Sequence, residues 1–286
     1  MVLAAGFGSR LRPLTDLRTK SLVPVGDRPA LEHLVDRLRI AQVSTIVVNA
    51  HHRAEELRAF APSHGILLSE EAEILGTAGG VARASALLGP GDALVWNADI
   101  IAEIDVDAVA AAHAKTTAHA TLVVQPRPAG EGRVGTDRRG RIVRLRSTRV
   151  ADEVSGGDFL GIYVLSAALR ALLPSRGCLI GDVCVPALRD GEDLRAFSCH
   201  CVWHDLGTPA SYLRANLAWL QARGVSGWFG ADADIAPGIR IERSIVGAGA
   251  AVAGSGALVG CVIWPGAHVT APLADTIVTP ETILTI

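Results

Sequence analysis

Residues 2–25 read "VLAAGFGSRLRPLTDLRTKSLVPV", and this stretch decides how the rest of the chain is interpreted. It begins as a short apolar strand, bends on two glycines and then gathers four basic side chains, Arg10, Arg12, Arg18 and Lys20. Glycines let the backbone approach an anion and present successive N–H groups, and arginine binds phosphate oxygens in a fork. The stretch therefore predicts a phosphate-binding loop after a first strand.

Two familiar glycine loops do not match this stretch. A Walker A loop requires Gly-Lys followed by Ser or Thr, which "GFGSRL" lacks. A dinucleotide fingerprint requires a third glycine, and Arg10 and Leu11 stand where that glycine would pack a helix on the strand. The alternative that stays open is a solvated turn with scattered basic residues.

The bulk composition favours a globular protein of one large or two smaller domains. The chain has 286 residues, 49% hydrophobic and 20% charged, which predicts a packed core. Its net charge of −2 argues against a general nucleic-acid binder. No apolar run is long enough for a bilayer, and the first residues do not resemble a signal peptide. Five irregularly spaced cysteines are expected to be reduced, so we expect a cytoplasmic protein without a membrane partner.

Strand-like and helix-like stretches alternate through the first half of the chain. Residues 44–50 and 93–99 are β-branched and apolar, whereas 29–41 repeats leucines at helical spacing. This alternation predicts parallel strands with crossover helices. A β-hairpin is expected over 133–146, and one strand over 194–207. A capped helix is expected over 208–223.

The last sixty residues follow a different period. One apolar series falls every six residues at Val246, Val252, Leu258 and Trp264. A second series runs over Ile239, Ile245, Ala251, Ala257, Ile263 and Val269. A six-residue period is typical of a left-handed β-helix, in which each hexad forms one side of a triangular coil. The alternative is a β-rich tail packed on the main domain.

Several motifs now carry a family resemblance. Residues 3–38, "LAAGFGSRLRPLTDLRTKSLVPVGDRPALEHLVDRL", closely resemble the signature of the sugar-1-phosphate nucleotidyltransferases. "ILGTAGGVARA", "VWNADI", "FLGIYVL" and "WHDLGTPASYLRA" are similar to the later motifs of that family, in the same order. The resemblance implies an α/β fold with a Rossmann-like, mostly parallel sheet over residues 1–225. The tail, residues 226–286, would form a short left-handed β-helix like that of longer family members.

The reaction implied by the resemblance is nucleotidyl transfer from a nucleoside triphosphate to a sugar-1-phosphate, with Mg²⁺ and release of pyrophosphate. Catalytic roles are implied for Arg10, Lys20 and Asp99, and Mg²⁺ would be held by Asp99 and Asp205. The sugar would lie at Gly161 and Asp205. The implied nucleotide-binding residues are Leu3, Ala4, Ala5, Gly6, Gly8, Ser9, Arg10, Gly76, Thr77, Gly79, Gly80 and Asn97.

The chain departs from the family pattern at two places. Thr19 stands where the family usually has proline before the lysine, which leaves Lys20 in place. The usual Glu-Lys-Pro after the hairpin is absent, and "RLRSTRVADE" occupies that position. Arg144 and Arg146 are interpreted as a solvated hairpin face, with a phosphate contact as the alternative. Glu73, before the glycine turn, is expected either at the surface or on substrate.

The resemblance leaves the base and the sugar open. Mannose-1-phosphate with GTP is favoured, and the alternatives are uridylyl or thymidylyl transfer to another sugar-1-phosphate. A catalytically silent nucleotide-sugar sensor is a rival of another class, and an acyltransferase using the hexads is a weak third. We also expect a homodimer through the tail, because about three coils are too few to cover their own open end.

Overall fold

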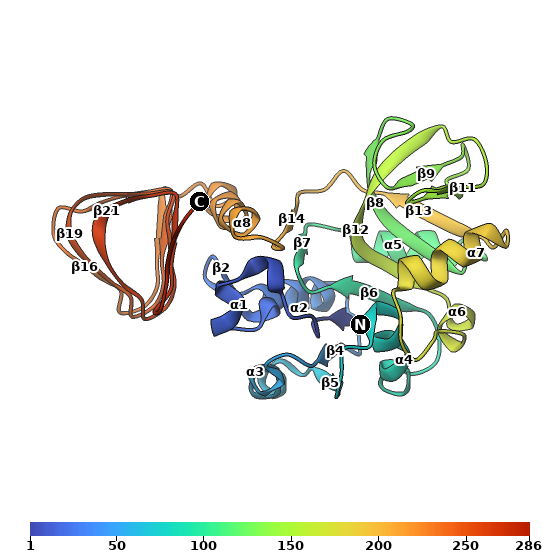
Figure 1. The fold of residues 1–286 in the computed structure, drawn as a ribbon, viewed down its shortest axis with the longest axis horizontal. Coiled ribbons are helices and arrows are strands. Elements are labelled where there is room, and N and C mark those ends of the chain that lie inside the picture. Colours follow the sequence, from blue (N-terminus) through green and yellow to red (C-terminus); the bar gives the residue numbers. More distant parts are fainter. The chain divides into compact units, whose positions relative to one another are not determined.

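The computed structural model describes all 286 residues, which form two compact units. One unit, here named the sheet unit, contains Met1–Gly6 and Leu34–Trp203. The other, the coil unit, contains Phe7–His33 and His204–Ile286. Figure 1 labels many of the elements of both units. The expected boundary at residue 225 separates two domains that would fold independently. Whether they do so stays a prediction.

The centre of the sheet unit is a parallel group of four strands in the order β5-β4-β1-β6. Val2 of β1 (Val2–Leu3) pairs with Val48 of β4 (Val47–Ala50) and with Trp96 of β6 (Ala93–Asn97). Helices follow β4 and β5 (Leu67–Glu70), namely α3 (Ala54–Phe60) and α4 (Gly76–Leu88). The predicted α/β class with parallel strands is confirmed.

Beyond β6 the sheet becomes mixed. The long strand β12 (Ser155–Leu165) runs antiparallel to β6, to β8 (Ala120–Arg127) and to β9 (Val134–Thr136). β9 pairs with β10 (Ile142–Leu145), which confirms the predicted hairpin. The other elements of this unit are β7 (Ile100–Ala102), α5 (Val106–Ala114), β11 (Thr148–Arg149), α6 (Ala167–Ala171), a π-helix (Leu179–Cys184), α7 (Val185–Arg189), β13 (Leu194–Ser198) and a 3₁₀ turn (Pro62–His64).

The core of the sheet unit packs apolar side chains of the sheet against α4 and the 179–188 helical segment. Val95, Leu122 and Tyr163 are almost fully buried in it.

The expected strand over 194–207 is two strands, β13 and β14 (Trp203–Asp205), interrupted at residues 199–202. The interruption ends the alternation of faces that a single strand would impose on Cys199 and Cys201. No helix of the structure is both long and apolar enough to span a membrane.

In the coil unit, residues Phe7–His33, here named the signature segment, pack on α8 (Pro209–Ala222). The segment contains the 3₁₀ turns Ser9–Leu11 and Lys20–Leu22, α1 (Leu14–Leu17), β2 (Pro24–Val25), β3 (Arg28–Pro29) and the start of α2 (Ala30–Ile40). α8 begins at a Thr208 capping box, with Pro209 in the first turn, as the sequence predicts. Gly224 follows its end with a φ of 66°, a left-handed conformation that favours glycine.

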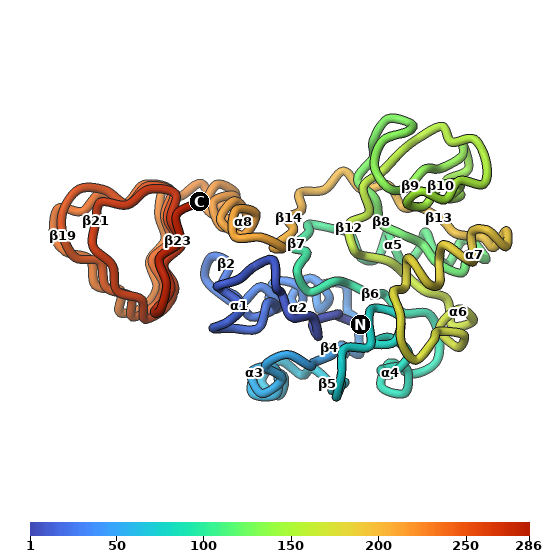
Figure 2. Tube along the Cα trace, viewed as in Figure 1, coloured from blue at the N-terminus to red at the C-terminus, as the bar shows by residue number.

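The tail consists of stacked parallel strands that repeat around a coil. Trp228 of β15 (Gly227–Phe229) pairs with Ile245 of β18 (Ser244–Val246), which pairs with Val262 of β20 (Val262–Ile263). Each step advances the chain by 17 residues (245 − 228 and 262 − 245), close to three hexads. Figure 2 shows these coils as stacked three-sided turns. The other strands are β16 (Asp234–Ile235), β17 (Arg240–Glu242), β19 (Ala251–Val259), β21 (His268–Ala274), β22 (Thr276–Val278) and β23 (Ile283–Thr285).

Residues of both hexad series contribute to the coil interior. Val246, Val252 and Leu258 are at most 2% exposed and belong to one apolar cluster with Ile263. Ile245, from the second series, is also buried but lies outside that cluster, because neighbouring residues of a strand point to opposite faces. The first series therefore identifies inward positions from 246 to 258, and beyond them the 17-residue register places Ile263 of the second series beside Val246.

Trp264 ends the first series and connects the coil to the signature segment. Its Nε1 donates to the Tyr212 hydroxyl at 2.9 Å, and that hydroxyl donates to the Pro24 carbonyl at 2.5 Å. Tyr212 is fully buried and Trp264 is 4% exposed. Trp264 is thus buried beside α8 and offers no apolar surface for association with another chain.

Candidate functional site

The end of β1 forms the first wall of the predicted nucleotide site. The Ala4 N–H donates to Asn49 Oδ1 at 2.6 Å, and the Leu3 carbonyl accepts from Ala98 N at 3.0 Å. Ala4 and Ala5 are buried, and the chain then reaches Gly6, where an added Cβ would meet nothing within 4 Å. Asn49 and Ala98 thus fix the backbone at Leu3 and Ala4 from two sides, and there is free space beside the backbone at Gly6.

A buried Asn49–Glu71 pair supports this wall and the glycine turn together. Asn49 Nδ2 donates to Glu71 Oε1 at 2.7 Å, and Glu71 Oε2 accepts from Leu75 N at 3.1 Å. A Cβ on Gly80 would lie 2.8 Å from Asn49 Nδ2 and 2.9 Å from Glu71 Oε1. Sequence reasoning missed both residues, although Asn49 is a polar side chain next to the last residue of the predicted strand 44–50.

Asn49→Ala is expected to lower the free energy of unfolding by about 1–3 kcal/mol, because it removes the hydrogen-bond partner of the buried Ala4 N–H and of Glu71 Oε1. Urea unfolding followed by circular dichroism measures the change. A variant as stable as the parent chain would contradict the role assigned to this pair.

The other residues of the "GTAGG" turn pack against a neighbouring loop. Gly76 has a φ of 77° and lies against the Gly177 backbone, while a Cβ on Gly79 would lie 2.9 Å from Arg176 Cα. Thr77 Oγ1 accepts from Leu179 N at 2.7 Å. Of this predicted wall, the structure therefore places Gly80 beside Leu3. Glu73 forms an exposed ion pair with Arg176 at 3.0 Å, which matches the surface interpretation.

Asn97 and Gly161 lie together where β6 ends beside β12. Gly161 has a φ of 73°, and a Cβ there would lie 2.6 Å from Asn97 Nδ2. Asn97 Oδ1 is buried without a hydrogen-bond partner. Asp99 follows two residues later, in the turn between β6 and β7. Buried amide oxygens in folded proteins usually accept a hydrogen bond, from the protein, from water or from a ligand.

In the coil unit, Gly8 brings the glycine loop close to Lys20. Gly8 has a φ of 64°, and a Cβ there would lie 2.7 Å from Thr15 Cγ2 and 3.2 Å from Lys20 Cβ. The Thr15 hydroxyl donates to the Gly8 carbonyl at 3.0 Å. Ser9 begins the 3₁₀ turn that follows. Only glycine fits this left-handed and crowded position.

Arg10 and Asp205 converge on Gly207. A Cβ on Gly207 would lie 2.7 Å from Asp205 Oδ1 and 3.1 Å from Arg10 Nη2. Asp205 Oδ1 is buried and has no hydrogen-bond partner. Arg12 instead pairs with Asp16 at 3.1 Å on the surface. The coil unit therefore places a guanidinium and an unsatisfied carboxylate oxygen around one glycine.

The two hairpin arginines are engaged within the sheet unit. Arg144 forms a bidentate pair with Glu153, at 2.6 Å from Nε, and donates to the Gly132 carbonyl at 2.8 Å. The pairing holds the pKa of the Glu153 carboxyl below its usual range. Arg144 is 13% exposed, so the expectation of a solvated face is wrong for it. Arg146 donates to Cys178 Sγ at 3.4 Å.

The structure groups the predicted residues by unit. Leu3, Ala4, Gly80, Asn97 and Gly161 surround the end of β1 and β6 in the sheet unit, with Asp99 in the turn after β6. Gly8, Arg10, Lys20 and Asp205 belong to the coil unit. The first group offers backbone, amide and small side chains suited to a planar base. The second offers the positive charge that phosphates require.

Comparison with known proteins adds a family and a fold. Residues 1–222 match the family model described as "Nucleotidyl transferase". The chain is 31% identical over 236 residues to a mannose-1-phosphate guanyltransferase from Yarrowia lipolytica, covering 78% of this chain and 64% of that protein. It is 46% identical over 126 residues to an N-acetylmuramate alpha-1-phosphate uridylyltransferase from Caulobacter vibrioides. This match covers 39% of this chain and 51% of that protein.

A solved structure shares the fold. It is a putative glucose-1-phosphate thymidylyltransferase from Bacillus anthracis, in complex with a sucrose, with a TM-score of 0.63 and 21% identity. The match covers 76% of this chain and 93% of that one. The chain spans 64% of the length of the Yarrowia lipolytica guanyltransferase, which is less than two thirds of that protein.

Proposed function

Because the chain belongs to the nucleotidyl transferase family, we propose that it makes a nucleotide-sugar and pyrophosphate from a nucleoside triphosphate and a sugar-1-phosphate. The favoured pair is GTP with mannose-1-phosphate, supported by guanyltransferase relatives such as that of Yarrowia lipolytica. The observation that carries the proposal is the convergence of Arg10 and the unsatisfied Asp205 carboxylate on Gly207.

In this reaction a sugar-1-phosphate oxygen attacks the α-phosphorus in line, and pyrophosphate leaves. Two anions repel each other, so the protein must align them and neutralise their charge. Arg10 would bind triphosphate oxygens in a fork, and Lys20 would add a positive charge beside the glycine loop. Leu3–Gly6, Gly80 and Asn97 would bind the nucleotide, and Gly161 and Asp205 would lie beside the sugar.

The carboxylates of Asp99 and Asp205 are of the ligand type that a magnesium site requires. Mg²⁺ prefers carboxylate oxygens together with phosphate oxygens and water. Asp205 Oδ1, buried without a partner, is an oxygen that a cation would satisfy. We propose that Asp99 and Asp205 hold Mg²⁺, which when bound neutralises phosphate charge.

The uridylyltransferase relative supports a second substrate pair, UTP with N-acetylmuramate-1-phosphate. Pyrophosphate release measured for each of the two pairs distinguishes them, and GTP with mannose-1-phosphate should be turned over faster. A protein that binds these nucleotides but releases no pyrophosphate would overturn the proposal and favour a nucleotide-sugar sensor. Arg144 and Arg146 are not expected to replace the missing lysine, because Glu153 and Cys178 engage them.

We propose that the tail is a left-handed β-helix and that the protein forms a homodimer through it. The 17-residue register and the three-sided turns support the first part. Exposed Phe229, Ile283 and Ile286 support the second, because they offer apolar surface on the tail.

Deleting the residues after Gly224 is expected to give a smaller species of lower stability, because Tyr212 loses its Trp264 partner and α8 becomes exposed. Multi-angle light scattering measures the mass, and a thermal shift measures stability. A full-length chain that is monomeric at micromolar concentration would end the dimer proposal. A truncated chain that keeps the full-length mass would move the interface out of the tail.

We place the protein in the cytoplasm. All five cysteines are free thiols, which suits a reducing compartment. A fluorescent fusion that separates with membranes or secreted material would contradict this location.

A further inference from the structure

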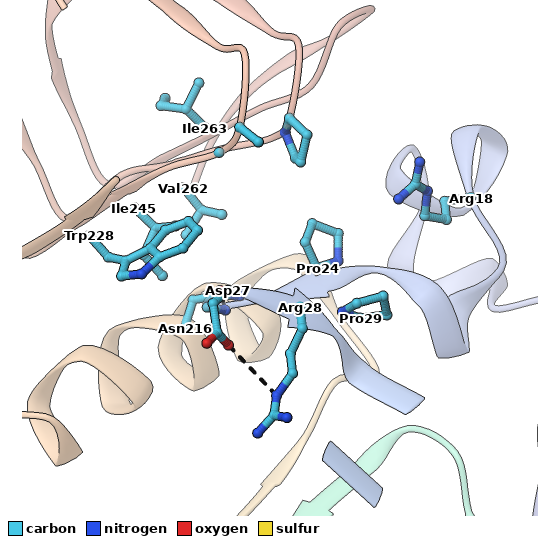
Figure 3. A pocket seen from close by; sticks show the side chains of 14 residues that line it. Arg18, Pro24, Asp27, Arg28, Pro29, Asn216, Trp228, Ile245, Val262 and Ile263 are labelled. Atoms are coloured by element: carbon cyan, nitrogen blue, oxygen red, sulfur yellow. Dashed lines mark hydrogen bonds and ion pairs between the residues drawn. The ribbon is translucent and has the colours of Figure 1, made fainter. Parts of the chain in front are cut away.

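The coil unit contains a small cavity that the proposed reaction does not use. Its volume is ≈ 120 Å³, and it lies between the signature segment, α8 and the tail. Figure 3 shows Trp228, Ile245 and Val262 on the side of the tail and Pro24 and Pro29 on the side of the signature segment. The remaining lining residues are Arg18, Gly26, Asp27, Arg28, Asn216, Gly247, Ala248, Ile263 and Pro265.

The walls of this cavity are held in place by contacts behind them. The Trp228 ring packs edge-on against Trp219, with centroids 6.1 Å apart, and the Arg223 guanidinium stacks on the other ring at 3.8 Å. The Gly26 N–H donates to Asn216 Oδ1 at 2.8 Å, and Asn216 is fully buried. Fixed walls keep the cost of ordering low when a ligand binds.

The size of the cavity limits the ligand. Pockets for drug-sized ligands and cofactors usually have about 300–1,000 Å³, so this one is too small for a nucleotide. An engineered apolar cavity of about 150 Å³ holds benzene. The space therefore suits a single ring of about six atoms, and the indole and aliphatic walls favour an apolar ring over a sugar.

The charges at the cavity select an anion. Arg18 is exposed, and Arg28 forms an ion pair with Asp27 at 3.7 Å, as Figure 3 shows. Two guanidiniums and one carboxylate leave one net positive charge among the lining residues. An anionic group would gain a charge-assisted hydrogen bond from an arginine there.

We propose that this cavity binds a small ligand made of one apolar ring and one carboxylate or phosphate group. The ring lies against Trp228 and Ile245, and the anion is bound by Arg18. The site is separate from the glycine loop, although the segment that lines it, Phe7–His33, also carries Arg10 and Lys20. Occupation of the cavity therefore changes the rate of pyrophosphate release, a consequence that rests on the proposed function.

Isothermal titration calorimetry of the full chain with phenyl phosphate and with benzoate tests the site without any turnover. We expect one site per chain for both, and at least tenfold weaker binding of inorganic phosphate and of benzyl alcohol, which each lack one part of the ligand. Comparing phenyl phosphate with benzoate then shows which anion the site prefers.

Two variants locate the binding. Ala248→Phe, at an exposed lining position, fills the cavity and should weaken binding at least tenfold and abolish any effect of the ligand on pyrophosphate release. Arg18→Ala should weaken it about threefold, as expected for an exposed charge pair. Arg12→Ala is the matched control and should have no effect, because Arg12 pairs with Asp16.

Equal binding of inorganic phosphate and phenyl phosphate, or unchanged affinity in Ala248→Phe, would overturn the proposal. Binding that Ala248→Phe abolishes, in a protein that releases no pyrophosphate with any substrate pair, would support the site and end the proposed function instead.

Discussion

Asp205→Asn is expected to reduce pyrophosphate release by about 10²-fold or more while the chain remains folded. The substitution keeps the shape of the side chain but removes the charge from an oxygen that is buried without a hydrogen-bond partner. Loss of one preorganised electrostatic group at a reacting centre typically has an effect of this size. Asp99→Asn should have a comparable effect. Single-turnover pyrophosphate release measures the change, and near-UV circular dichroism checks the fold.

A matched control separates metal binding from a general effect of charge. Asp107→Asn neutralises a carboxylate in the first turn of α5, outside both groups of predicted site residues, and should leave turnover within twofold. Raising the Mg²⁺ concentration should partly restore Asp205→Asn but not the Arg10 variant described next. Near parental turnover in both aspartate variants would remove them from the proposed magnesium site.

Arg10→Ala is expected to weaken triphosphate binding and slow transfer by about ten- to hundredfold. One lost hydrogen bond to a charged group costs about 1.5–3 kcal/mol, and 1.36 kcal/mol corresponds to tenfold. The Arg10 guanidinium lies beside Gly207 in the coil unit, close to the Asp205 carboxylate. KM and kcat for the triphosphate, measured at saturating sugar-1-phosphate, report the change.

Arg12→Ala is the control for this prediction. Arg12 is exposed and pairs with Asp16 at 3.1 Å, so its removal should change either constant by less than threefold. Equal damage from both variants would show that the loop acts through its overall positive charge. The specific cradle at Arg10 would then be abandoned.

Local patterns in the sequence predict most elements of the fold. Alternation of apolar strands with helices leads to the parallel group around β1, and the Thr208 cap leads to α8. The six-residue period finds Val246, Val252 and Leu258 inside the coil. These features depend on neighbours in the chain or on a short repeat, and both can be read from sequence.

The features that the sequence did not reveal depend on distant partners. Asn49 and Glu71 meet through adjacent strands, and nothing within either strand signals a pair. The break at residues 199–202 contradicts an apolar run that reads as one strand. The engagement of Arg144 by Glu153 depends on the fold of the hairpin, so the arginine appears solvated in sequence.

The hydrogen-bonded series Trp264–Tyr212–Pro24 has a consequence for protein engineering. A chimaera that exchanges the tail for that of another protein also exchanges the donor that holds Tyr212. Such a graft keeps the whole hydrogen-bonded series only when the incoming residue offers an N–H at the position of Trp264 Nε1, because the Tyr212 hydroxyl by itself provides only the bond to the Pro24 carbonyl. Compatibility between a borrowed tail and this chain can therefore be screened at one position before any chimaera is expressed.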